Sequence, residues 1–224
     1  MRVIITGSTG MVGKSVLLEC LRNDKISSVL VVNRRPVGLT HPKLTELLHQ
    51  DFLDLNPLLS QLEGYDACFH CMGVSAVGMK EADYTRLTYE LTVHWVDTLY
   101  KLNPDMVFNY VSGAGTDSSE KGRAMWARVK GKTENKVLNK GFKDAYAFRP
   151  GGIIVEKGVT SAKGSVSRLY ALLKPLLILM KNSRYVTTGA NIGKAMINSL
   201  SKPGSNKHLE NLDIDELAKL PTSL

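Results

Sequence analysis

The sequence predicts an α/β fold, a doubly wound parallel sheet with a small C-terminal substrate-cleft region. A glycine-rich turn directly follows a β-branched segment at residues 3–6 and precedes an amphipathic segment. Apolar segments of strand length then alternate with helical patterns, which is typical of βαβ units with right-handed crossovers. Because no repeat or low-complexity linker interrupts this alternation, we expect a single domain over 1–224, with a cofactor part of about 1–150 and a cleft and lid part of about 151–224.

The glycine-rich turn predicts a site for the pyrophosphate of a dinucleotide. Its residues are Gly7, Ser8, Thr9, Gly10, Met11, Val12 and Gly13. In a Rossmann-type turn the first glycine takes the required backbone conformation, the second lets main chain approach the phosphates, and the third lets helix pack on strand. The helix N-terminus then offers free N–H groups to the anion. An ATPase or GTPase P-loop ending at Lys14 and Ser15 is disfavoured, because Ser8 stands where that motif needs glycine.

Hydrophobic periodicity predicts the other elements in order. Residues 28–33 form an apolar run of the kind found in strands that are buried on both faces. Longer segments with apolar residues at helical spacing begin at about residues 82 and 123. The complete prediction comprises strands 3–6, 28–33, 47–51, 66–71, 106–112 and 145–148, helices 12–21, 82–101 and 123–138, and a short helix within 211–220.

Composition limits the class of protein. A chain of 224 residues needs no disulfide or metal to stabilise its core. The three cysteines follow no framework spacing, and the C-x-x-C of Cys68 and Cys71 lies within an apolar run. We interpret it as small residues of a buried strand and predict no metal site. Reduced thiols and the lack of an N-terminal signal segment predict a cytoplasmic location.

The net charge of +8 is concentrated in the second half of the chain. Residues 120–207 hold eighteen Lys and Arg against four Asp and Glu, a local balance of +14. This asymmetry indicates an anionic partner or a phosphorylated cofactor. No nucleic-acid motif accompanies the charge, so no nucleic acid is expected as a partner. We expect a monomer or a homodimer.

An apolar stripe within the basic half leaves two interpretations open. It consists of Leu169, Leu172, Leu173, Leu176, Leu177 and Met180, at helical spacing. The stripe either packs on the sheet and caps the substrate cleft, or forms a peripheral contact with an anionic membrane or a protein partner. The glycine-flanked segment 158–164 before it is a candidate lid.

Residues that follow the strands predict the rest of the cofactor site. After the second strand, Asn33, Arg34 and Arg35 replace the acid that usually binds the ribose hydroxyls of NAD. Because a guanidinium can make bidentate contacts to a phosphate, we expect NADP(H). The further expected contacts are Asp51 and Phe52 at the adenine, Cys71, Met72 and Gly73 at the ribose, and Pro150, Gly151 and Gly152 at the nicotinamide end.

On these motifs the chain resembles the short-chain dehydrogenase/reductase superfamily in its atypical or extended branch. The resemblance rests on the glycine turn, on Asp51 after the third strand and on Arg149-Pro150-Gly151 after the sixth. Within that branch the chain is similar to the HTATIP2-like NAD(P)H-binding oxidoreductases nearly from end to end. This similarity passes through Val129-Lys130-Gly131 and Phe148-Arg149-Pro150-Gly151 to His208-Leu209-Glu210-Asn211. The resemblance implies a Rossmann fold, a nicotinamide cofactor and hydride transfer to a small acceptor.

The resemblance also implies catalytic positions, one of which departs from the family pattern. Ser112 after the fifth strand would orient the substrate, and Lys130 would hold the nicotinamide ribose. The family's acid is a tyrosine four residues before the lysine, where this chain has Trp126. An indole N–H donates a hydrogen bond but is no practical acid near neutral pH. Tyr110 is a weak replacement, and the match of Tyr170 with Lys174 is attributed to chance because it follows the sixth strand.

Three functions therefore remain open. In the first, the protein is a reductase: NADPH delivers a hydride to a carbonyl, quinone or flavin type of acceptor, and the proton comes from water or from the substrate. Alternatively, it binds NADPH without turnover, as a sensing or interaction protein. In the third, Ser112 or one of Asp117, Ser118 and Ser119 delivers the proton through ordered water.

Overall fold

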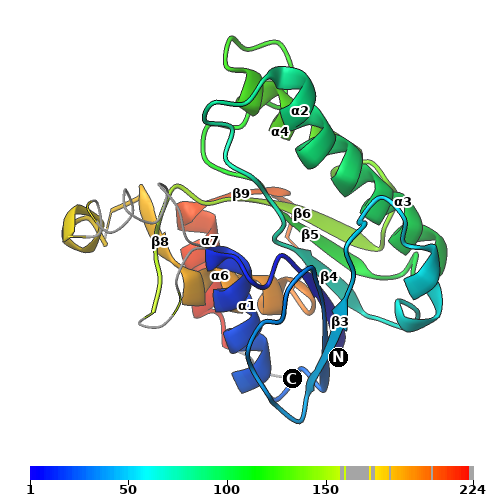
Figure 1. Ribbon diagram of the computed structural model, residues 1–224. Helices are drawn as coiled ribbons and strands as arrows, with labels where there is room; N and C mark the ends of the chain where they lie inside the picture. The colour runs from blue at the N-terminus through cyan, green and yellow to red at the C-terminus, as the bar shows by residue number, and fades with distance from the viewer. Residues whose placement is uncertain (157–158, 160–171, 173–174, 182, 203, 222–224) are drawn as a thin grey trace.

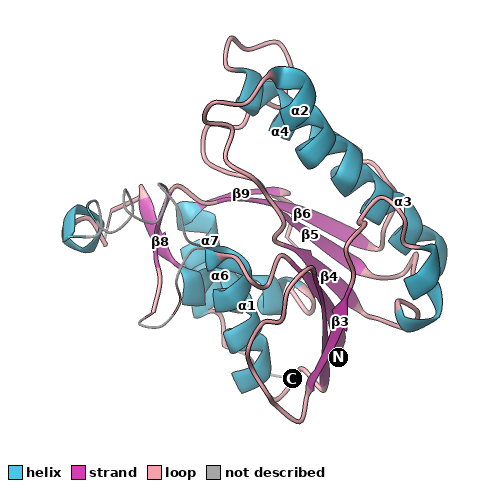
Figure 2. Ribbon diagram, viewed as in Figure 1, coloured by secondary structure: helices cyan, strands magenta, loops and turns pink. Residues whose placement is uncertain are grey.

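The computed structural model describes residues 1–156, 159, 172, 175–181, 183–202 and 204–221. Its main sheet has seven parallel strands in the order β3-β2-β1-β4-β5-β6-β9, which run together through the middle of the molecule in Figure 2. They are β1 (Arg2–Thr6), β2 (Ser28–Asn33), β3 (Leu44–Leu48), β4 (Ala67–His70), β5 (Val107–Val111), β6 (Asp144–Arg149) and β9 (His208–Glu210).

Helices cover both faces of this sheet, as Figure 1 shows. One face carries α1 (Met11–Arg22), α6 (Gly189–Ser199) and α7 (Asn211–Lys219). The other carries α2 (Glu81–Thr85), α3 (Leu91–Leu102) and α4 (Met125–Leu138), with a π-helical turn, Arg86–Glu90, between α2 and α3 and a short 3-10 helix at Asn56–Gln61. The arrangement is the predicted doubly wound α/β fold.

The alternation of side chains along the strands builds two separate cores. Val3 and Ile5 of β1 pack toward α1 and α6, whereas Ile4 between them packs with Trp95 and Leu99 of α3. Successive residues of a strand point to opposite faces, so a strand covered on both faces must be apolar throughout. This explains why β1 and β2 read as continuous apolar runs.

The order of the strands places the ligand-binding edge. β1 pairs with β2 on one side and with β4 on the other, so the chain reverses its direction of winding at β1. In such sheets ligands bind beyond the carboxyl ends of the strands at this switch point. The glycine turn, which follows β1, and the residues that follow β4 therefore meet at the predicted position.

The structure corrects several element boundaries. The third strand is Leu44–Leu48, not 47–51, and the long second helix is interrupted by the π-helical turn. The sequence prediction missed β7 (Gly152–Ile154), β8 (Val186–Thr188) and β9, because three residues are too few to show a period. It also missed α6, which carries glycine at its first and fifth positions.

The residues after about 150 contribute both to the main fold and to a smaller unit. β9 joins the edge of the main sheet, whereas β7 and β8 form a separate parallel pair. Apart from Val159, the predicted lid, 158–164, lies outside the described residues, and so do Leu169 and Leu173 of the apolar stripe. Of the described stripe, Leu172 and Leu176 are exposed, and Leu177 lies against the backbone of β7. Within the described part of the chain, no helix is long and apolar enough to cross a membrane.

Candidate cofactor and catalytic site

The three glycines of the turn have three distinct geometries. Gly7 has φ +71°, and a Cβ there would lie 2.7 Å from the carbonyl carbon of Cys71 at the end of β4. A Cβ on Gly13 would lie 2.2 Å from the carbonyl oxygen of Gly7, so α1 can pack this closely only without a side chain. A Cβ on Gly10 would meet only that same oxygen, at 3.3 Å. The roles expected of Gly7 and Gly13 are thus accounted for by contacts inside the protein, and Gly10 borders open space.

The N-terminus of α1 fits a dinucleotide pyrophosphate. Gly10 is the N-cap residue, no side chain caps the helix, and its first turn carries no acid. The first N–H groups of a helix have no partner within it, and they lie at the positive end of the helix dipole. Main-chain donors at Met11, Val12 and Gly13, next to a residue without a side chain, form the cradle that such an anion requires.

A chain of buried polar contacts fixes the turn to the second and third strands. Ser8 is fully buried, and its hydroxyl donates to Oδ1 of Asn33 at 3.0 Å. The amide of Asn33 donates in turn to Oε1 of Glu46 on β3, at 2.9 Å, and the Val37 N–H donates to the same oxygen at 2.8 Å. The side chains of Ser8 and Asn33 are therefore structural rather than free for a ligand. Glu46 was not predicted as part of this site, because nothing in its local sequence pattern relates it to residues 33–37.

Two arginines border the adenosine end of the turn. Arg34 and Arg35 are exposed, and with Asn33, Thr9 and Met72 they line a small cavity of about 70 Å³ beside Gly7. The guanidinium carbon of Arg34 lies 6.0 Å from the centre of the Phe52 ring, which itself packs edge-on against Trp95 at 6.0 Å. This arrangement offers two cations and an aromatic edge to a phosphorylated adenosine.

A larger cavity of about 570 Å³ adjoins this one, between the loops that follow β3 and β4 and the helical segment after them. Its lining includes Asp51, Met72 and Gly73, three of the residues expected to contact the adenine and the ribose. The carboxylate of Asp51 also accepts a hydrogen bond from the Leu53 N–H at 2.9 Å, so it shapes its own turn. The rest of the lining was not predicted from the sequence: Met79 in the loop before α2, and Asp83, Arg86, Leu87 and Leu91 in the helical segment.

Ser112 and Lys130 meet at the carboxyl end of β5. The Ser112 hydroxyl lies 2.7 Å from that of Thr116, which donates to the Gly113 carbonyl at 2.8 Å. Lys130 Nζ, from α4, donates to the Ser112 carbonyl at 2.5 Å. Burial lowers the pKa of Lys130 to about 8, although the Glu134 carboxylate acts in the opposite direction. The two predicted residues are thus brought together from separate elements.

Trp126 occupies the helical turn before Lys130 and faces the same loop. Its indole lies against Gly115, where an added Cβ would be 3.4 Å from the ring. Tyr110 is not a replacement for the missing tyrosine, since its side chain is 1% exposed and belongs to the core beneath α3 and α4. Burial raises the pKa of the Tyr110 phenol far above its ordinary value. Tyr170 lies outside the described residues.

The loop that follows Ser112 uses its own acid for its structure. The Asp117 carboxylate accepts hydrogen bonds from the Ser119 hydroxyl at 2.6 Å and from the Gly122 N–H at 2.6 Å, and these bonds lower its pKa. Ser118 Oγ accepts a hydrogen bond from the guanidinium of Arg149 at 2.5 Å. These partners make all three residues poor candidates for the proton donor.

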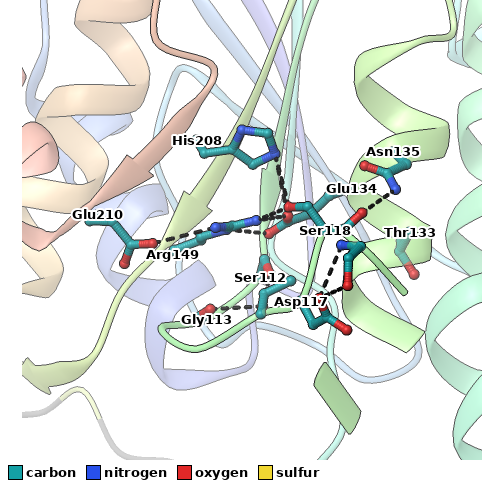
Figure 3. A network of polar contacts seen from close by, with 12 residues as sticks. Ser112, Gly113, Asp117, Ser118, Thr133, Glu134, Asn135, Arg149, His208 and Glu210 are labelled. Carbon is teal, nitrogen blue, oxygen red and sulfur yellow. Dashed lines mark hydrogen bonds and ion pairs between the residues drawn. The ribbon is translucent and has the colours of Figure 1, made fainter. Parts of the chain in front are cut away.

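A buried ion pair joins α4, the helix that carries Lys130, to β6 (Figure 3). Glu134 of α4 is 0% exposed and accepts two hydrogen bonds from Arg149 of β6, at 3.0 and 2.5 Å. His208 and Glu210 of β9 lie at 3.6 and 3.5 Å from this pair. One turn earlier on α4, a Cβ on Gly131 would lie only 1.8 Å from the Asp117 carbonyl oxygen. The loop that carries Asp117 therefore packs directly on the helix backbone, where no side chain fits. No local pattern in the sequence predicted this network.

The loop after β6 is held by the C-terminal segment. The Pro150 carbonyl accepts from the Ala114 N–H at 3.0 Å, which joins this loop to the one that carries Ser112. Asn211, 4% exposed, accepts from the Gly151 N–H at 3.0 Å and donates to the Arg184 carbonyl at 3.2 Å. Gly152 donates its N–H to the Tyr185 carbonyl. The backbone of Gly151 and Gly152 is therefore engaged within the protein.

The sequence is similar to that of two known proteins. Protein HTATIP2 of Rattus norvegicus is 26% identical over 221 residues, which cover 97% of this chain and 89% of that protein. Protein FMP52, mitochondrial, of Candida albicans is 24% identical over 243 residues and covers all of both chains. Both similarities extend along nearly the whole sequence.

Solved structures show the same fold at low identity. The Bordetella bronchiseptica enzyme WbmF in complex with NAD+ has a TM-score of 0.70 at 12% identity, over 96% of this chain and 76% of that one. The UDP-glucose 4-epimerase of Thermotoga maritima has a TM-score of 0.70 at 14% identity, over 98% and 82%. The model of the NAD dependent epimerase/dehydratase family matches residues 3–121, which include the glycine turn and Ser112. The chain belongs to the NAD dependent epimerase/dehydratase family, the extended short-chain dehydrogenase/reductase type of NAD(P)-dependent oxidoreductase.

Proposed function

We propose that the protein is an NADP(H)-dependent reductase of a small carbonyl, quinone or flavin type of acceptor that works without the family's tyrosine. The observation that carries this proposal is the Ser112–Lys130 pair, joined at 2.5 Å on the same sheet edge as the glycine cradle. The bound dinucleotide would supply a hydride. Ser112 keeps a hydroxyl oxygen beside that edge, Lys130 holds a cation there, and Trp126 presents a flat apolar surface suited to a planar acceptor.

The preference for NADP over NAD rests on the charges around the adenosine end. Arg34 and Arg35 are free to contact a 2′-phosphate. Glu46 is the acid that lies behind them, and its Oε1 already accepts from Asn33 and from the Val37 N–H. A carboxylate oxygen that already accepts two hydrogen bonds is less available to ribose hydroxyls. This supports a site that favours the phosphorylated cofactor.

Titration with both cofactors tests the preference. We expect replacement of Arg34 and Arg35 by alanine to weaken NADPH binding roughly 30-fold, as for the loss of charged hydrogen bonds worth about 2 kcal/mol, with little effect on NADH. Arg123→Ala removes an exposed arginine elsewhere and serves as the matched control. Equal losses for the two cofactors would refute the assignment.

The absence of a conventional acid favours a second candidate, a protein that binds NADPH and responds to it without turnover. Trp126 stands in the tyrosine position and Tyr110 is buried in the core. Steady oxidation of NADPH in the presence of nitrobenzaldehyde or phenanthrenequinone separates the two candidates. Tight NADPH binding without oxidation would favour the sensing protein.

A further inference from the structure

The proposed reductase needs a proton for the acceptor oxygen, and most groups near Ser112 cannot give one. The Ser112 hydroxyl is directed to Thr116, whose own hydrogen is donated to the Gly113 carbonyl. The Asp117 carboxylate is ionised and bound within its own loop. An indole such as that of Trp126 does not lose its proton near neutral pH. A donor must therefore be sought elsewhere on the same edge.

The amine of Lys130 lies at the junction of the loops that follow β5 and β6. Its Nζ is 2.5 Å from the Ser112 carbonyl oxygen. If Gly113 carried a Cβ, that atom would lie 3.4 Å from Lys130 Nζ and 4.0 Å from the Pro150 carbonyl oxygen, so the amine is close to both loops. One of its three hydrogens bonds to Ser112, which leaves others for a ligand. Among the described residues around Ser112, Lys130 thus combines an ionisable proton with a position at the ligand-binding edge.

The part of α4 that carries Lys130 is held firmly by its neighbours. The helix backbone at Gly131, the next residue, lies directly against the Asp117 carbonyl. One turn further on, Glu134 is fixed by two hydrogen bonds from Arg149. A proton donor acts efficiently when its position is fixed relative to the acceptor, because little orientation is then lost during the reaction.

We propose that Lys130 Nζ, rather than a hydroxyl group, donates the proton to the acceptor oxygen in the reduction proposed above. The π bond of the acceptor C=O breaks, its carbon gains the hydride and its two electrons, and its oxygen gains the proton from the N–H bond of Lys130. The cofactor is oxidised and the acceptor reduced. The neutral amine then regains a proton from solvent. This inference rests on the proposed function.

The charges around the amine set the direction of its titration. Burial lowers the pKa of Lys130 to about 8, whereas the Glu134 carboxylate raises it. That carboxylate is itself neutralised by Arg149 of β6 and faces His208 of β9, and Asp117 of the adjoining loop is bound to Ser119 and Gly122. Carbonyl reduction should therefore be constant below about pH 8 and fall above it.

The first test uses Lys130→Arg in the full-length protein. A guanidinium preserves the positive charge and the hydrogen bonds to a ribose, but it does not give up its proton. We expect NADPH affinity within about threefold of wild type and a loss of roughly 100-fold or more in nitrobenzaldehyde reduction, the usual contribution of a general acid. Lys132→Arg is the matched control, because Lys132 is exposed and its Nζ lies over the Tyr89 ring.

A second readout does not depend on turnover. The pH dependence of amine labelling by trinitrobenzenesulfonate, followed at Lys130 by mass spectrometry, should show a midpoint near the value of about 8 given above. Reduction that persists unchanged in Lys130→Arg, with the same pH profile, would overturn this inference while leaving the reductase intact. NADPH binding without oxidation by either acceptor would overturn the reductase and this inference together.

Discussion

Two glycine-to-alanine substitutions in one turn should affect different properties, because the two glycines have different surroundings. Gly13→Ala should lower the stability of the fold, and Gly10→Ala should lower the affinity for NADPH. In Gly13→Ala the new Cβ would lie 2.2 Å from the Gly7 carbonyl oxygen and 2.7 Å from its carbon, both of them backbone atoms. In Gly10→Ala the nearest atom is that same oxygen at 3.3 Å, and the other directions are open. Gly13→Ala therefore strains the packing of α1 on β1. Gly10→Ala only reduces the space beside the N–H groups of Met11, Val12 and Gly13.

The magnitudes follow from these contacts. Alanine in place of a helical glycine gains about 1 kcal/mol in propensity, but an overlap of about 1 Å with fixed backbone costs roughly 1–3 kcal/mol or more. We therefore expect Gly13→Ala to lose about 2 kcal/mol of the free energy of unfolding. Gly10 is the N-cap of α1 and has φ −85°, so alanine there should cost under about 1 kcal/mol. NADPH affinity should nevertheless fall at least tenfold in Gly10→Ala.

Urea unfolding measures the first effect, and NADPH titration followed by tryptophan fluorescence measures the second. The useful comparison is the difference between the two variants, since both change one hydrogen into a methyl group. A Gly10→Ala protein that binds NADPH as tightly as wild type would show that Gly10 does not face the phosphates. A Gly13→Ala protein with an unchanged urea midpoint would contradict the packing role of Gly13.

Three further outcomes are expected. Glu134→Gln should reduce the free energy of unfolding by about 3 kcal/mol in urea titrations, because it leaves the largely buried Arg149 without its main charge partner. Trp126→Tyr should create or raise NADPH-dependent reduction of nitrobenzaldehyde; no gain would mean that the tyrosine hydroxyl cannot reach the acceptor from this helix. The free energy of unfolding of wild type, relative to that of Lys130→Met, should rise with pH by roughly 2.5 kcal/mol between the folded pKa of Lys130, about 8, and the ordinary lysine pKa of 10.5. Over this range the unfolded chain binds more protons at Lys130 than the folded chain does, and a flat difference would contradict the assigned burial.

The cofactor half of the site was predictable because its determinants are local. A strand, three glycines and a helix follow one another in a single stretch, and backbone sterics alone fix what each glycine does. The contacts of Gly7 and Gly13 in the structure match the roles that their spacing predicts. Ser112 and Lys130 come from different elements, and their meeting was expected only through the family resemblance.

Residues that act through distant partners escaped the sequence analysis. Glu46 lies thirteen residues beyond Asn33, and only the parallel pairing of β2 with β3 brings the two together. Glu134 and Arg149 look like ordinary charges on a basic segment until β6 and α4 are packed. Asn211 follows a three-residue strand and reaches back sixty positions to Gly151. No periodic or local signal reports such tertiary pairings.

The burial of the Lys130 amine supports the proposed functional role of this lysine over a merely structural one. An amine in this position disfavours its own charge, since burial lowers its pKa against the attraction of Glu134. Its hydrogen bond to the Ser112 carbonyl could be made equally well by water or by a neutral donor, and Glu134 is already paired with Arg149. Folding therefore gains little from a lysine here. Residues whose charge is perturbed by burial and whose position is fixed by a second layer are typical of sites that bind or react. Because Trp126 stands in the tyrosine position, we expect Lys130 to be the residue at this edge that holds the transferable proton.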